Sequence, residues 1–155
     1  MASWLAECHL ELSGLVLINP LVEPPAVELF EALRDMLASG VEVAPGIGSD
    51  IAIPGVTELA YDATPLRAGL SLFEAAGTVG DALGDIRCPV LLLTSREDHV
   101  VPASNGARVM ASVAGPVERI WLERSYHVAT LDYDSDELEA RTVAFASMVL
   151  AGAEG

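Results

Sequence analysis

Two loops in the second half of the chain carry side chains that could perform acid–base chemistry. Asp98 follows the apolar segment of residues 90–95, and His127 follows the alternating segment of residues 117–122. A carboxylate bonded to one imidazole nitrogen fixes the tautomer and leaves the other nitrogen free as a base. The residue types also fit a plainer interpretation, in which Asp98 is a turn or helix-cap residue and His127 is a solvated loop residue.

The surrounding elements decide whether these two side chains can meet. Apolar runs predict buried strands over residues 15–19 and 90–95, and alternation predicts a third strand over 117–122. Helical patterns occur at residues 3–12, 26–38, 65–84, 102–115 and 134–152. This order predicts an α/β fold with a parallel sheet. A right-handed crossover makes the last two strands neighbours, so Asp98 and His127 are expected to face one another at their carboxyl ends.

Composition excludes several classes of function. The chain has 23 acidic and 8 basic residues, all arginine, for a net charge of −15. Such a surface repels nucleic acids and acidic membranes, and no lysine nucleophile is possible. No apolar run reaches the roughly 18 residues of a transmembrane helix, and the acidic N-terminus is not a signal peptide, so we expect a cytoplasmic location. The isolated Cys8 and Cys88 are expected to be small buried apolar side chains.

The stretches "IRCPVLLLTSREDHVVP" (86–102) and "LERSYHVATLDYD" (122–134) contain paired motifs. They fit the patterns I-x-x-P-V-L, D-x-V-V-P and S-x-H-V-x-x-x-D. With "SGLVLINP" (13–20) and "YDATPLRAGLSL" (61–72), they resemble the C-terminal half of α/β-hydrolase serine esterases of the carboxylesterase and monoacylglycerol-lipase-like group. The resemblance implies that Asp98 is the acid and His127 the base of a Ser-His-Asp triad, with a small ester or acylglycerol as substrate and no cofactor or metal. It assigns no role to His99.

The sequence departs from that group at the nucleophile. It has no G-x-S-x-G motif, and "GIGSD" (46–50) follows no buried strand and lacks the second glycine. Ser95 lies at the end of the strand before Asp98, Ser125 lies two residues before His127 on the same loop, and Ser3 is in the opening helix. The first 20 residues resemble the helix and strand that follow the nucleophile. We therefore expect one partial α/β-hydrolase domain over residues 1–155, with about three parallel strands and a cap-like insertion at about 22–64.

Several functional interpretations stay open at this stage. The chain could be part of an ester hydrolase whose nucleophile lies outside it, or an inactive hydrolase fragment or interaction module. A metal-dependent hydrolase using Asp98, His99 and His127 is disfavoured. The adjacent Asp98 and His99 are expected to point apart on an extended loop, which leaves one of them with His127, and no third ligand has a suitable spacing. Without the preceding strands of the family sheet, the strand at 15–19 would leave an apolar edge, so we expect self-association or a complementing N-terminal fragment.

Overall fold

A computed structural model describes residues 1–153 of the chain, with a three-stranded parallel sheet at its centre. The strands are β1 (Leu15–Ile18), β4 (Val90–Ser95) and β5 (Val117–Leu122), in the order β1-β4-β5. In the register of the sheet, Leu92 of β4 pairs with Leu17 on one side and with Arg119 on the other. The predicted fold class, a partial α/β-hydrolase fold with three parallel strands, is confirmed.

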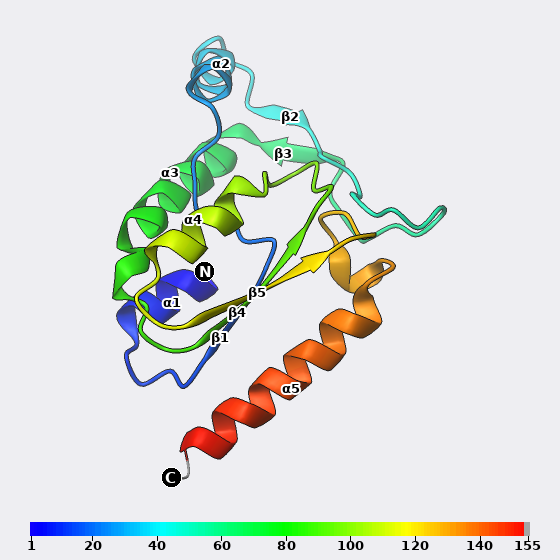
Figure 1. The fold of residues 1–155 in the computed structure, drawn as a ribbon. Helices are drawn as coiled ribbons and strands as arrows, with labels where there is room; N and C mark the ends of the chain where they lie inside the picture. Colours follow the sequence, from blue (N-terminus) through cyan, green and yellow to red (C-terminus); the bar gives the residue numbers. More distant parts are fainter. Residues whose placement is uncertain (154–155) are drawn as a thin grey trace.

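Helices cover both faces of this sheet (Figure 1). The first face carries α1 (Ala2–Cys8), α3 (Leu66–Ala82) with the 3-10 turn η1 (Leu83–Asp85), and α4 (Ser104–Ser112). The second face carries α5 (Ser135–Ala153), preceded by the 3-10 turn η2 (Ala129–Leu131). In the part of the chain that the structure describes, no helix is long and apolar enough to cross a membrane, and the cytoplasmic location stays a prediction.

The core lies on both sides of β4, because successive strand side chains point to opposite faces. Val90 and Leu92 pack with the first layer of helices, and Leu91 and Leu93 pack under α5. All six residues of β4 are buried, as its apolar sequence predicts. In β1 burial alternates instead, so the two-sided burial suggested by its apolar run is only partly realised. The reason is position: β1 is an edge strand with β4 as its sole strand partner in the described sheet.

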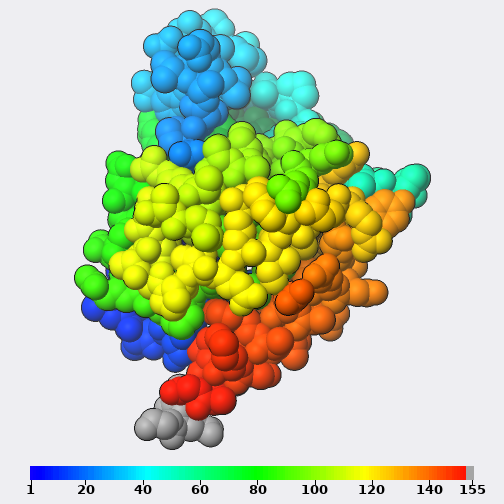
Figure 2. All heavy atoms as spheres, in the orientation of Figure 1, coloured from blue at the N-terminus to red at the C-terminus, as the bar shows by residue number. Residues whose placement is uncertain are grey.

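Residues 22–64, called here the connecting segment, hold α2 (Val27–Ala38) and the strand β2 (Val43–Pro45). β2 pairs antiparallel with β3 (Ala63–Pro65), which lies at the end of the connecting segment. The sequence analysis did not predict this ribbon within the cap-like insertion, because three-residue strands are too short to produce a periodic pattern. Figure 2 shows α2 as a lobe that stands out from the body of the molecule, and none of its residues is buried.

The N-terminal helix differs from its prediction. α1 ends at Cys8 rather than at residue 12, and it buries Ser3 and Ala6 while Trp4 remains 51% exposed. The cysteines are also less buried than predicted, with Cys8 exposed and Cys88 half-buried. The physical reason is close packing: α1 lies against β1 and η1 through its small side chains, and its larger ones point outward.

Candidate functional site

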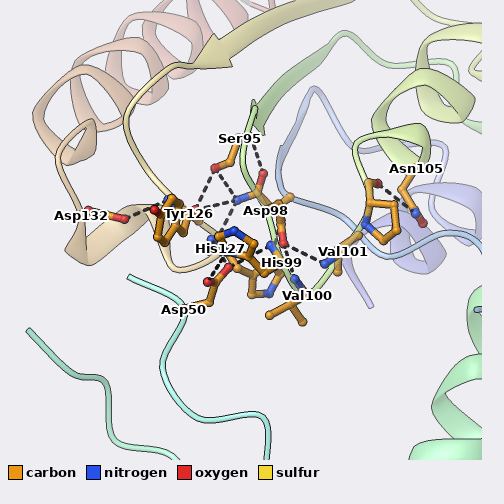
Figure 3. A network of polar contacts seen from close by, with 12 residues as sticks. Asp50, Ser95, Asp98, His99, Val100, Val101, Asn105, Tyr126, His127 and Asp132 are labelled. Atoms are coloured by element: carbon orange, nitrogen blue, oxygen red, sulfur yellow. Dashed lines mark hydrogen bonds and ion pairs between the residues drawn. The ribbon is translucent and has the colours of Figure 1, made fainter. Parts of the chain in front are cut away.

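Asp98 and His127 meet at the carboxyl edge of the sheet (Figure 3). Asp98 lies in the loop after β4, the acid loop (residues 96–101), and His127 lies in the loop after β5, the histidine loop (residues 123–134). His127 Nδ1 is 2.9 Å from Asp98 Oδ2. The carboxylate side chain is 2% exposed and the imidazole 30%. The predicted facing of the two side chains is therefore present in the structure.

The Asp98 carboxylate is oriented by its own loop. Oδ1 accepts hydrogen bonds from the backbone N–H groups of Val100, at 2.9 Å, and of Val101, at 2.7 Å. These bonds make Asp98 a turn residue, as the plainer interpretation of the sequence expected. They also leave Oδ2 directed at His127. Asp98 is therefore both a turn residue and the hydrogen-bond partner of His127.

The end of β1 contributes Asn19, which hydrogen-bonds to both loops. Its Oδ1 accepts the N–H of Ser95 at 2.7 Å, and its Nδ2 donates to Ser95 Oγ and to the carbonyl of His127, each at 2.9 Å. Ser95 Oγ in turn donates to the carbonyl of Tyr126 at 2.8 Å. Asn19 has φ 44°, a left-handed conformation that asparagine tolerates better than most residues.

A buried carboxylate, Asp132, organises the other side of the histidine loop. Its two oxygens accept the N–H groups of Tyr126 and Tyr133, at 2.9 and 2.8 Å, within that loop. They also accept the N–H groups of Ala52 and Ile53, at 2.8 and 3.2 Å, from the connecting segment. Asp132 is 1% exposed. One carboxylate therefore joins the connecting segment to the loop that carries His127.

Asp50 makes a second connection of this kind. Its Oδ2 accepts the N–H groups of His127 and His99, at 3.0 and 3.1 Å. Its Oδ1 is 2.7 Å from His99 Nδ1, and its backbone carbonyl accepts the N–H of Val128 at 3.1 Å. His99, expected to be a simple loop residue, is therefore bound to the connecting segment.

The electrostatic environment favours the protonated form of His127. The hydrogen bond to Asp98 raises the pKa of His127 above its ordinary value, and the negative charges of Asp98, Asp50 and Glu58 act in the same direction against the opposing effect of burial. Burial also tends to raise the pKa of Asp50, but the hydrogen bonds from His99 and from the His127 amide outweigh it. The pKa of Asp50 therefore lies below its usual value.

No serine in the described residues hydrogen-bonds to the imidazole of His127. Ser95 is 0% exposed and occupied by Asn19 and by the carbonyl of Tyr126. Ser125 is 1% exposed, and its Oγ accepts the N–H of Asp134 at 2.8 Å. Both serines are thus structural. Residues 1–153 also contain no group of three or more histidine, cysteine or acidic side chains arranged to hold a metal ion.

Two hollows adjoin the site. A cavity of about 470 Å³ is lined mainly by apolar side chains, among them Leu21, Leu29, Ile47, Phe73 and Val100. A smaller hollow of about 250 Å³ contains His127, and its walls include Asp50 and Glu58. Ile47 and Val100 line both hollows, so the apolar cavity adjoins the hollow that contains His127.

Sequence reasoning did not single out Asn19, Asp50 or Asp132 as parts of this network. A signal was present for two of them: Asn19 is the last residue of a predicted strand, and Asp132 is the final residue of the S-x-H-V-x-x-x-D pattern. Asp50 lies in an aperiodic stretch, and nothing in the sequence near it points to the histidine loop, which is 77 residues away.

Comparison with known proteins finds similarity to lipolytic enzymes of the same fold. No protein-family model matches the chain. The thermostable monoacylglycerol lipase of Bacillus sp. (strain H-257) is 37% identical over 145 residues, which are 92% of this chain and 56% of that lipase. The solved structure of a metagenome-derived lipolytic enzyme is 38% identical with a TM-score of 0.86, over 92% of this chain and 58% of that one.

A more distant structure shares the fold alone. The monoacylglycerol lipase of Paleococcus ferrophilus is 16% identical with a TM-score of 0.73, over 96% of this chain and 63% of that one. The chain thus spans somewhat more than half the length of the relatives it matches. Its fold is a partial α/β-hydrolase fold, and its sequence is similar to those of lipolytic enzymes, among them a monoacylglycerol lipase.

Proposed function

We propose that this chain supplies the base and the acid of a serine ester hydrolase that acts on small esters or acylglycerols. One observation carries the proposal: His127 Nδ1 lies 2.9 Å from the buried Asp98 Oδ2 while the imidazole is still 30% exposed. His127 Nε2 forms no hydrogen bond with any residue in the described part of the chain. A ring held in this way can accept a proton from a group outside it.

The chemistry follows from the two nitrogens of the ring. Asp98 keeps the proton of neutral His127 on Nδ1, so Nε2 is the free base. Nε2 would remove the proton of a serine hydroxyl as its oxygen attacks the ester carbonyl, and would return that proton to the departing alcohol. Water would then hydrolyse the acyl-serine by the same route, while the Asp98 carboxylate stabilises the imidazolium formed in each step.

The substrate class is supported by the cavity beside His127. Its volume of about 470 Å³ is in the range typical of small-molecule pockets, and its apolar lining suits an acyl chain. The connecting segment contributes Leu29 and Ile47 to the lining. We infer that residues 22–64 form the cap over an acyl-binding site, with the reacting carbonyl placed toward the smaller hollow at His127.

The nucleophile has to come from outside residues 1–155 in this proposal. The surface along α1 and β1 offers a place for the complementary part. Trp4 is 51% exposed and Leu10 is 72% exposed, and β1 has a strand partner only on its β4 side in the described sheet. We infer that this surface either binds a complementing hydrolase fragment or drives self-association.

A second candidate function is an inactive hydrolase fragment or interaction module. It is favoured by the absence of G-x-S-x-G from the sequence and by the structural roles of Ser95 and Ser125. On this alternative the Asp98–His127 pair would stabilise the two loops and take part in no reaction.

The test compares hydrolysis of a monoacylglycerol and of a short acyl p-nitrophenyl ester. The full chain is assayed alone and together with the part of the Bacillus lipase that this chain does not span, with and without His127→Gln. Hydrolysis that His127→Gln abolishes supports the proposal. A mixture without any hydrolysis, or with hydrolysis that His127→Gln leaves intact, favours the inactive module.

Two further variants test the role of Asp98 and provide a control histidine for any hydrolysis that is measured. Asp98→Asn should lower the rate by several orders of magnitude, about 10⁴-fold, because the wrong imidazole tautomer is then stabilised. His9→Gln is the matched control, since His9 is exposed and bonded to Glu11, and it should leave the rate unchanged.

A further inference from the structure

A single oxygen of Asp50 bridges the two loops that carry Asp98 and His127 (Figure 3). Oδ2 accepts the N–H of His127 at 3.0 Å and the N–H of His99, the residue directly after Asp98, at 3.1 Å. Because both loops hydrogen-bond to one atom, the position of that atom constrains the separation of the loops. The Asp50 side chain is only 13% exposed, so these bonds are partly shielded from water.

The other oxygen of Asp50 extends the constraint to a second ring. Oδ1 lies 2.7 Å from His99 Nδ1. The His99 ring packs edge-on against Tyr126, with ring centroids 4.5 Å apart and an interplanar angle of 83°. Asp50 therefore acts on the residue before His127 through His99, and on His127 itself through the backbone.

The backbone of His127 is held on both sides by side chains from distant segments. Asp50 accepts its N–H, and Asn19 Nδ2 donates to its carbonyl at 2.9 Å. Because Asp50 and Asn19 together restrict rotation of the chain at His127, they restrict the direction of its Cα–Cβ bond. That direction determines whether Nδ1 reaches the Asp98 carboxylate.

We propose that Asp50 is a positioning residue that couples the connecting segment to the Asp98–His127 pair. The positioning of His127 by Asp50 does not depend on the proposed function, but any effect of Asp50 on catalysis does. Asp50 and Ile47 lie three residues apart in the connecting segment, and Ile47 lines the apolar cavity. The stretch that lines the cavity therefore also holds the backbone of His127.

The experiment reads the state of the His127 ring by NMR, so it does not depend on catalytic activity. The full chain has three histidines, and selective ¹⁵N-histidine labelling resolves three imidazoles, assigned with His9→Gln and His99→Gln. The Asp50→Ala variant should shift neutral His127 from the Nδ1–H toward the Nε2–H tautomer. The amide protons of His99 and His127 should exchange about tenfold faster, as expected on losing a hydrogen bond to a charged acceptor.

Glu58→Gln is the matched control for charge. The carboxylates of Glu58 and Asp50 both raise the pKa of His127, together with that of Asp98, but only Asp50 hydrogen-bonds to the His127 backbone. Glu58→Gln should therefore lower the pKa of His127 and leave its tautomer and amide exchange as in the wild type. The proposal is overturned if Asp50→Ala changes His127 no more than Glu58→Gln does.

Two more variants cover the case in which Asp50→Ala does not fold and separate the role of Asp50 from the proposed function. If Asp50→Ala unfolds, Asp50→Leu replaces it, because leucine has a similar shape and no hydrogen-bond acceptor, and wild-type exchange at both the His99 and His127 amides in that variant overturns the proposal. Asp98→Asn separates the two hypotheses. An unchanged His127 tautomer in Asp98→Asn removes the pairing on which the proposed function depends. A changed tautomer in Asp98→Asn but not in Asp50→Ala removes the role of Asp50 alone.

Discussion

The histidine loop and the surface along α1 and β1 differ in how their side chains are satisfied. Polar groups of the loop are buried and hydrogen-bonded, whereas large apolar side chains along α1 are exposed. In the histidine loop, the buried carboxylate of Asp132 receives four backbone N–H groups, and Ser125 exchanges hydrogen bonds with Asp134. Along α1 and the turn that follows it, large apolar side chains face outward. Trp4 is 51% exposed and Leu10 is 72% exposed.

This difference shows where the described residues supply all the contacts that a region needs and where they do not. The polar groups of the histidine loop find their partners within the chain, from segments as distant as residues 19 and 52. The apolar side chains along α1 have no such cover, although burying them would stabilise the fold by about 25 cal/mol for each Å² removed from water. We therefore expect the loop to tolerate few changes, and the α1 surface to tolerate many.

The largest expected effect is that of Asp132→Ala. It leaves four backbone N–H groups without their acceptor in a site where Asp132 was 1% exposed. The free energy of unfolding should fall by about 3 kcal/mol or more. Urea denaturation measures the free energy of unfolding. Asp62→Ala, a change at an exposed carboxylate, is the matched control and should lower that free energy by about 0.5 kcal/mol or less. A loss below about 1 kcal/mol for Asp132→Ala would contradict the comparison.

A smaller effect, which depends on pH, is expected for the Asp98–His127 pair. The pKa of His127 is raised in the folded protein, chiefly by its hydrogen bond to Asp98. Its contribution to stability is therefore fully present below the unfolded-state pKa and is lost as the pH rises through the folded-state pKa. The difference in unfolding free energy between the wild type and Asp98→Asn should narrow over that interval.

Denaturation curves recorded at a series of pH values between about 5 and 9 measure this difference. In a His127→Gln background the difference should no longer depend on pH through this histidine. A wild-type difference that stays constant or widens as the pH rises would show that the pair does not titrate as the structure implies.

The smallest effect on stability is expected for Trp4→Ser on the α1 surface. Because Trp4 is half exposed, the free energy of unfolding should change by about 1 kcal/mol or less. Self-association should decrease clearly, as measured by sedimentation velocity. Leu150→Ser on α5 is the matched control, since Leu150 is 66% exposed on the other face of the sheet, and it should leave association unchanged. A monomeric wild-type protein would rule out this role for Trp4.

Much of the fold could be predicted because its signals are local. The apolar run predicted the buried strand β4, and the amphipathic pattern of residues 26–38 predicted the helix α2, although none of the residues of α2 is buried. The prediction was wrong where packing overrides local pattern. α1 buries Ser3 and Ala6 instead of its larger residues, and the three-residue strands β2 and β3 had no periodic signal.

The candidate site was predictable in part for the same reason. Asp98 and His127 follow strands, and the parallel order of those strands brings their loops together at one edge of the sheet. Their catalytic roles stay predictions, as do the cap role of the connecting segment and the binding of a complementing fragment. Asp50 could not be predicted, because its partners are 49 and 77 residues away and it lies in no regular element.

The sequence was therefore sufficient to predict the central strands, their parallel order and the pairing of an aspartate with a histidine at the strand ends. These features follow from short-range patterns and from the handedness of crossover connections. The side chains that hold this pair in place are visible only in the folded chain. The backbone of His127 is fixed by Asn19 from β1 and by Asp50 from the connecting segment. Such contacts depend on how distant loops pack against one another, and no local pattern of residues records that packing.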